Sequence, residues 1–362
     1  MLLGGRRELA EYWHRKDGDH VAEAVFRAVQ RLDEAQSHVR SQDLHHLRLY
    51  LGRYVSGLTA HEYSRKSPQN TAKPTFNLVR AIVDSVVARF AQEIARVTVL
   101  TDDGDYDMQR KAQRRESFAE GQFSEAKIGD LNLAALRDAG VFGTGCIKLY
   151  DENDRNKAER VPKWELLVDE ADAYYGTPKQ LFQHKVWSPE VLAECYPEAK
   201  EKILTADLIR DNRSSEETLL DLVSVCEAWH LPSYPDADDG RHVICISNDV
   251  LLDERWERDR FPFEFIHWRP PAIGFWGCGV AENQSGTQLA IAKLLKVYHE
   301  FLTLNVPLIA ILRGSQIVKS HLVNVPWTVI EHTGPNAPQA LVWPTMDPAN
   351  VQELLRLIQS GF

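Results

Sequence analysis

The sequence predicts an α+β fold in which helices flank a central region of short strands. Near the start of the chain, apolar residues such as Val21 and Val25 recur at helical spacing. Over residues 146–269 the apolar residues alternate in short runs instead, which is typical of strands. Helical spacing then returns over residues 285–305. This order of periodicities favours mixed helices and strands over a helical bundle or an all-β fold.

The first third of the chain is predicted to be mainly helical. Residues 19–54 form a first helical segment, and the polar run SRKSPQNTAKP at 64–74 indicates a connector. A second helix begins near Phe76 and carries a stripe of valines and isoleucines. Residues 107–140 are rich in Ala, Leu, Gln and Glu and predict further helices that end at a glycine.

The middle of the chain predicts a mixed domain with an antiparallel sheet. A strand at Cys146–Tyr150 follows a Gly-Thr-Gly turn, and alternating runs such as VSVCEAWHL and FPFEFIHW continue the pattern. Ser188 is the expected N-cap and Pro189 the first-turn residue of one helix over SPEVLAECYPEAKEKIL. The run DGRH at 239–242 predicts a tight turn between two strands.

Towards the C-terminus we expect a glycine bend, a long helix and a small β-containing segment. Gly274, Gly277 and Gly279 are hinge candidates, because glycine permits sharp bends. The helix at 285–305 would be on the order of 30 Å long at 1.5 Å per residue. Its apolar stripe supplies candidate subunit-interface residues, which are Leu294, Leu295, Tyr298, Phe301 and Leu302. After a β-rich insert, Asp347 and Pro348 predict the start of another helix.

The composition indicates a globular protein without a membrane span, a zinc ribbon or a disulfide framework. The chain has 362 residues, of which 44% are hydrophobic and 26% are charged, as in globular proteins. The longest apolar run, Val306–Leu312, contains a proline and is too short to span a bilayer. The five cysteines are scattered without a CxxC pair, so neither a zinc ribbon nor a disulfide framework is indicated.

The net charge of −10 is distributed unevenly along the chain. Residues 1–100 carry 15 Lys and Arg against 11 Asp and Glu, whereas residues 101–312 carry 24 against 38. A protein that grips DNA tightly normally presents a basic face. If DNA is a partner of this chain, we therefore expect it to slide past the protein.

The most enzyme-like motif is the glycine-rich run Gly140–Lys148, in which a lysine follows a glycine turn. It has the wrong order for a kinase phosphate loop, and the Gly-Lys-Ser/Thr ending of a Walker A loop is missing. No His-Glu-x-x-His motif and no Gly-x-Ser-x-Gly elbow occur. We therefore expect no catalytic, cofactor-binding or metal-binding residue, with a nucleotide- or nucleic-acid-acting enzyme using Gly140–Lys148 as the alternative.

Taken in order, these segments resemble the portal proteins, or head–tail connectors, of tailed bacteriophages. FNLVRAIVDSVVARFAQEIARVTVLTDD is similar to the family's helix that leads into the wing domain. LAALRDAGVFGTGCIKLYDE resembles its element of helix, glycine turn and strand. The hairpin DGRHVICISNDVLLDE and the stretch FPFEFIHWRPPAIGFWGCGVAENQSGTQLAIAKLL follow the family's order of wing strands, glycine bend and stem helix. VPLIAILRGSQIVK resembles the start of its clip.

The resemblance covers the chain from about residue 75 onward. It implies a portal-like α+β fold with an α/β wing domain, long stem helices and a small β-containing clip, truncated before the family's crown. The expected division is N-terminal helices at 1–63, a polar connector at 64–74, the wing at 75–273, the glycine bend and first stem helix at 274–305, the clip at 306–345 and the start of a second stem helix at 346–362.

The resemblance also implies a structural, non-enzymatic role. The expected partners are further copies of the chain in a cyclic homo-oligomer, commonly a dodecamer, and double-stranded DNA passing through its channel. Terminase, head–tail adaptor proteins and the major capsid or scaffolding protein are the other expected partners, with no membrane and no cofactor. The expected location is the portal vertex of the virion capsid, and the host cytoplasm during assembly.

Overall fold

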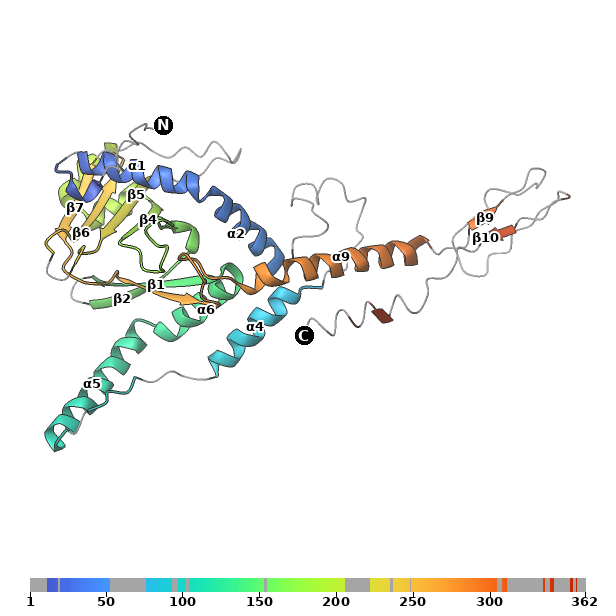
Figure 1. Cartoon of the computed structure of the whole chain (residues 1–362), viewed down its shortest axis with the longest axis horizontal. Helices are drawn as coiled ribbons and strands as arrows, with labels where there is room; N and C mark the ends of the chain where they lie inside the picture. Colours follow the sequence, from blue (N-terminus) through green and yellow to red (C-terminus); the bar gives the residue numbers. More distant parts are fainter. Residues whose placement is uncertain are drawn as a thin grey trace, which may run out of the picture. The chain divides into compact units, whose positions relative to one another are not determined.

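A computed structural model gives the fold of the protein (Figure 1). It describes residues 12–18, 20–52, 76–92, 97–101, 104–152, 155–205, 222–234, 237–247 and 249–304, with short stretches at 308–310, 335, 339–341, 352–353 and 356. The chain divides into two compact units. The first unit comprises residues 1–51 and 79–285, and the second comprises residues 52–78 and 286–362.

The first unit contains a five-stranded antiparallel sheet with the strand order β3-β4-β5-β6-β7. Its strands are β3 (Leu166–Leu167), β4 (Gln180–Trp187), β5 (Val223–His230), β6 (Arg241–Ile246) and β7 (Asp249–Arg255). Successive side chains of a strand point to opposite faces. Phe182, Cys226 and Val243 therefore lie on one buried face, and Leu181 and Trp229 lie on the other. The sheet is covered on both sides.

A second antiparallel sheet in the same unit has the strand order β2-β1-β8. Its strands are β1 (Thr144–Glu152), β2 (Arg155–Val161) and β8 (Phe263–His267). The strand predicted at Cys146–Tyr150 is the centre of β1. The helices and strands confirm the α+β class and the antiparallel pairing. The strands form two sheets, however, whereas the sequence predicts one.

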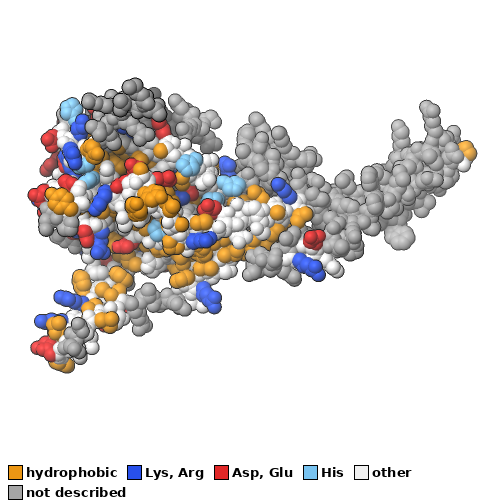
Figure 2. All heavy atoms as spheres, viewed as in Figure 1, with side chains coloured by type: hydrophobic (Ala, Val, Ile, Leu, Met, Phe, Trp, Pro, Cys, Tyr) orange, Lys and Arg blue, Asp and Glu red, His pale blue; other side chains and the backbone are white. Residues whose placement is uncertain are grey.

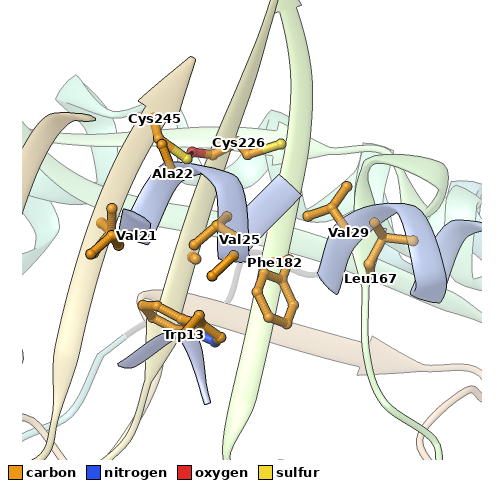
Figure 3. Close-up of a cluster of buried hydrophobic side chains, with 12 residues drawn as sticks. Trp13, Val21, Ala22, Val25, Val29, Leu167, Phe182, Cys226 and Cys245 are labelled. Carbon is orange, nitrogen blue, oxygen red and sulfur yellow. Dashed lines mark hydrogen bonds between the residues drawn. The ribbon is translucent and has the colours of Figure 1, made fainter. Parts of the chain in front are cut away.

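Helix α1 (His20–Ala35) covers one face of the five-stranded sheet. Val21, Val25 and Val29 lie one turn apart and belong to one buried cluster with Phe182 of the sheet (Figure 3). Trp13, in the short helix η1 (Trp13–Arg15), closes this core, and its indole Nε1 donates to Gln180 Oε1 at 2.8 Å. Full burial of one such apolar side chain contributes about 1.5–3 kcal/mol. The helical spacing near the start of the chain thus fixes which face of α1 is buried.

The other face of the five-stranded sheet packs against the three-stranded sheet. The core between the sheets is aromatic, and Trp229 meets Phe263 edge to face with 4.9 Å between ring centroids. Cys146, which lies on β1, is buried in the same core. Phe275, from the glycine-rich segment, packs edge to face on Phe265. The glycine-rich segment is therefore part of the core of the first unit.

A helical layer completes the first unit. It includes α2 (Ser37–Tyr50), α4 (Leu78–Ala91), α6 (Ile128–Phe142) and the start of α9 (Val280–Leu304). Val83, Val141 and Val280 share one core in this layer. Helix α5 (Tyr106–Glu125) packs mainly along α6 and extends away from the sheets (Figure 1). Most of the surface of α5 is consequently exposed.

Two of the predicted helical segments each contain two helices in the structure. The segment predicted at 19–54 breaks at Gln36, whose buried side-chain amide donates to the Val168 carbonyl. The segment at 107–140 breaks before α6 at Lys127, which has a left-handed φ of 51°. The first division occurs at a buried polar side chain and the second at a left-handed turn. The spacing of apolar residues does not reveal either feature.

The predicted helix that opens at Ser188 is also divided. Pro197 separates α7 (Pro189–Cys195) from α8 (Lys200–Thr205), with the short η3 (Pro197–Ala199) between them. Pro189 occupies the first turn, as predicted, but the Ser188 side chain makes no capping hydrogen bond. The tight turn predicted at 239–242 is wrong as well, because β6 already begins at Arg241 and the connection from β5 is longer.

The second unit contains the rest of α9 and a pair of short strands. Helix α9 begins at Val280, earlier than predicted, and continues to Leu304. β9 (Leu308–Ala310) pairs antiparallel with β10 (Gln339–Leu341), so the predicted segment at 306–345 contains β structure. No described helix is both long and apolar enough to cross a bilayer. The connector at 64–74, most of the predicted β-rich insert and most of the helix predicted to start at Asp347 lie outside the described residues.

Candidate functional site

Lys148, the lysine of the glycine-rich motif, is buried between the two sheets. It lies on β1 and points toward the five-stranded sheet, with 7% of its surface exposed. Its Nζ donates to Glu227 Oε2 at 2.5 Å and to Gln183 Oε1 at 3.2 Å. It also lies 4.9 Å from the centroid of the Trp229 ring. From the sequence alone we expect Lys148 to be an ordinary strand lysine. This expectation is wrong, because β1 turns the residue inward and buries it.

The lysine belongs to a chain of polar contacts across the five-stranded sheet. Glu227 Oε1 lies 3.1 Å from His242 Nε2, and His242 Nδ1 lies 2.7 Å from Glu254 Oε1. The ring of His242 also stacks on Trp229, with 5.0 Å between centroids. These contacts satisfy the charges of Lys148 and Glu227 inside the core.

Burial and charge pairing act in opposite directions on this network. Burial lowers the pKa of Lys148 below its ordinary value, although the neighbouring Glu227 carboxylate opposes the shift. For Glu227, burial alone would raise the pKa. Hydrogen bonding from His242 and the charge of Lys148 outweigh that effect, so the pKa of Glu227 is lowered. The lowered pKa favours the carboxylate form of Glu227 inside the core.

The glycines of the motif face packed backbone. A Cβ on Gly143 would lie 1.9 Å from the Gly277 carbonyl oxygen, and a Cβ on Gly145 would lie 1.9 Å from the Ala135 carbonyl oxygen. The Gly143 amide donates to Ala139 O at 2.8 Å. A phosphate-binding loop needs space and free amides. Gly143 and Gly145 instead allow helix α6, strand β1 and the segment before α9 to approach closely.

Two of the three hinge candidates lie at this same contact. Gly277 and Gly279 pack against the backbone around Gly143, and the Gly277 amide donates to Thr144 Oγ1 at 2.9 Å. Gly274 has a φ of +87° and open space where a Cβ would be. This close packing is sufficient to explain why glycine occupies positions 277 and 279, so a hinge motion is not needed to account for them. A hinge at these three residues stays a prediction.

A second buried ion pair holds helix α2 to the sheets. Lys163 Nζ lies 2.9 Å from Asp43 Oδ1 and donates to the Phe142 carbonyl at 3.1 Å. Burial raises the pKa of Asp43, and the charge of Lys163 opposes this shift. In the sequence, Asp43 lies in a polar stretch of helix without any motif. Sequence reasoning therefore could not identify it.

A cleft of about 680 Å³ opens beside this pair, between α2 and the sheets. Most of its charged side chains have partners: Lys185 pairs with Glu159 at 2.5 Å, Arg160 pairs with Asp138, and Glu165 accepts from the Gln183 amide at 3.1 Å. Trp164 lies at its edge and is partly exposed. The cleft can accommodate a small ligand, but it presents no surplus of one charge.

The candidate interface residues all lie on α9. Leu294 is exposed, with 41% of its surface accessible, and Leu295 is half-buried. The side chains of Tyr298, Phe301 and Leu302 lie outside the described set. The structure thus places these residues on one helix, and their role as an interface stays a prediction.

Among the described residues, no group of three or more His, Cys, Asp or Glu side chains could hold a metal ion. No family model matches the sequence, and no curated protein matches it.

Proposed function

We propose that the protein is a structural subunit of a phage portal ring. In this role it would form part of a channel for DNA packaging and ejection at the capsid vertex. Terminase and head–tail adaptor proteins would dock on the ring. The proposal rests on the resemblance in sequence order, and three features of the structure support it.

The main support is the order of the elements along the chain. Helix α6, the Gly143 turn and strand β1 are followed by the wing-like sheets, the segment at 274–279 and the long helix α9. The paired strands β9 and β10 then stand where a clip is expected. The expected order of wing, bend, stem and clip is thus compatible with the described elements.

Helix α9 has dimensions that suit a stem. Its 25 residues span about 37 Å at 1.5 Å per residue. Leu294 leaves an apolar side chain exposed on it. A neighbouring subunit in a ring could bury such a residue, because ring contacts join different surfaces of identical chains.

The charge distribution also suits a channel. The chain has a net charge of −10, and residues 101–312 supply most of the acidic excess. Walls with the same sign of charge as the DNA backbone hold it in no deep binding minimum, so a duplex can slide past them.

Negative-stain microscopy together with mass measurement in solution tests the proposal. We expect a closed ring with a central hole and a mass of many subunits. A chain that remains monomeric across protein concentration and salt would contradict the portal proposal.

The alternative, an enzyme acting on nucleotides through Gly140–Lys148, has less support. Lys148 Nζ is engaged by Glu227, and Gly143 has no space for a phosphate. A thermal shift measured with ATP and magnesium separates the two proposals, because a nucleotide-binding protein would be stabilised by its ligand.

A further inference from the structure

Helix α5 carries a basic face that the described chain leaves unpaired. Lys111 is three and four residues before Arg114 and Arg115, which are in turn four and three residues before Phe118, so the four lie on one side of the helix. All four are exposed, and Phe118 has 67% of its surface accessible. The three cations make no ion pair with any described residue. Figure 2 shows Lys and Arg side chains beside hydrophobic ones over the projecting end of α5.

The loop before β4 is acidic and is also exposed. It contains Asp169, Glu170 and Asp172, followed by Tyr174 and Tyr175. Tyr175 is 90% exposed and Tyr174 is 50% exposed. None of the three carboxylates pairs with a cationic side chain among the described residues. This acidic tyrosine loop is therefore complementary in charge to the basic face of α5.

Backbone hydrogen bonds fix the conformation of the acidic tyrosine loop. Asp169 Oδ1 accepts from the Ala171 amide at 2.9 Å, and Asp172 Oδ2 accepts from the Lys179 and Gln180 amides. Glu170 is exposed and makes no such bond among the described residues. The surface is thus held in one shape before any partner arrives, which lowers the entropy that binding costs.

We propose that the basic face of α5 in one copy of this chain docks on the acidic tyrosine loop of a second copy. The inference rests on the proposed function, since it names a contact between neighbours in the ring. Arginine suits this contact because it pairs with carboxylates and stacks on aromatic rings. The contact joins two different surfaces, so repetition closes a ring or extends a filament.

Other partners fit the two surfaces less well. The acidic residues on β7 are already matched within the chain, as Asp253 pairs with Arg241 at 2.5 Å. DNA could contact the cations of α5, but the net charge of −10 repels a polyanion at long range. The acidic tyrosine loop offers carboxylates and exposed aromatic rings together, and it is present in every copy.

Two variants of the full chain test the contact. The helix variant Arg114→Glu/Arg115→Glu reverses the charge of α5 and keeps its own loop intact. The loop variant Glu170→Arg/Tyr175→Arg neutralises the charge of the loop and spares the two aspartates that fix the turn. Each variant alone should self-associate more weakly by roughly 100-fold or more, because the helix variant places like charges in contact and the loop variant loses the charge attraction. An equimolar mixture should associate again, since the intact helix face of the loop variant can dock on the intact loop of the helix variant.

Mass photometry or analytical ultracentrifugation at about 0.15 M salt measures these species. Circular dichroism and the unfolding midpoint show whether each variant is folded. Glu194→Arg/Glu198→Arg is the matched control, because both residues are exposed acids elsewhere on the first unit and its charge change is similar. The control should assemble as the unaltered chain does.

The outcomes separate the inference from the proposed function. Rings that persist unchanged in both variants would overturn the inference and leave the portal proposal standing. If the unaltered chain forms an open filament or a dimer that each variant disrupts, the contact is supported and the proposal of a closed portal ring is contradicted. An unaltered chain that is monomeric at every concentration would overturn both. If the helix variant loses affinity for duplex DNA and still assembles, α5 binds nucleic acid and the inference is wrong.

Discussion

Charged side chains buried between layers determine much of the behaviour of the first unit at the scale of single residues. The ion pairs Lys148–Glu227 and Lys163–Asp43 each join two elements that are distant in sequence. Taking such charges out of water is costly, and their attraction offsets this cost only when hydrogen bonds complete the site. Removing one partner leaves the other charge buried and unpaired, so each pair is sensitive to single substitutions.

We therefore expect Lys148→Ala to destabilise the protein by about 3–5 kcal/mol, because it leaves the carboxylate of Glu227 buried without its cation. Urea denaturation at neutral pH measures the change. The double variant Lys148→Met/Glu227→Gln should lose much less stability than the sum of the two single changes. A cost below about 1 kcal/mol for Lys148→Ala, as for an exposed residue, would contradict the buried pair.

A second prediction at this scale concerns pH. Burial lowers the pKa of His46 from its ordinary 6.5 to about 4, so the folded state binds this proton less readily than the unfolded state. Stability should be complete above pH 6.5 and decrease as the pH falls toward 4. His46→Gln should make this decrease shallower by up to about 1.4 kcal/mol per pH unit.

The measurement is the free energy of unfolding at pH 7, 6 and 5 for the unaltered chain and the variant. His20→Gln is the control, because His20 is exposed at the start of α1. Part of the pH dependence of the free energy of unfolding should remain in the variant, because burial also lowers the pKa of His14 to about 4. Identical slopes for His46→Gln and the unaltered chain would show that His46 binds its proton equally well in the folded and unfolded states, which would contradict a lowered pKa.

At the scale of elements, close backbone contact between α6, β1 and the start of α9 organises the first unit. Gly143→Ala places a Cβ against the Gly277 carbonyl and strains a left-handed φ of +89°. We expect a loss of more than about 3 kcal/mol, because either the turn or the facing segment must move.

The matched control is Gly121→Ala on α5, where a Cβ would meet nothing within 4 Å. This change should leave stability unaltered or raise it by up to about 1 kcal/mol, since alanine favours helices. Thermal unfolding of both variants gives the comparison. Equal effects of the two substitutions would show that the contact at Gly143 is loose.

At the scale of the whole molecule, the central question is whether α9 contributes to assembly. Its apolar residues motivate the variants Leu295→Asp and Phe301→Asp, which should reduce ring formation about tenfold or more while leaving the circular dichroism of the first unit intact. Sedimentation and negative-stain images provide the measurement. If both variants form rings as abundantly as the unaltered chain does, α9 does not contribute to the subunit interface.

The sequence by itself determined the class of the fold and the position of most elements. Periodicities of 3.6 and 2 residues identified α4, the core of β1 and the long helix near 285–305, because each element must bury one face. Gly140–Lys148 was also visible as a helix, a glycine turn and a strand. These features are local, and local spacing is what a sequence displays directly.

Only the tertiary structure decided what the charged and glycine residues do. Lys148 and Asp43 look solvent-exposed in sequence, yet each is paired with a residue more than 70 positions away. Gly143 and Gly277 are also distant in sequence, yet their backbones are in contact in the folded protein. The partition of the strands into two sheets likewise depends on which strands pair, and β1 pairs with β8 across more than 100 residues. Such choices depend on packing between distant segments, which residue spacing along the chain does not encode.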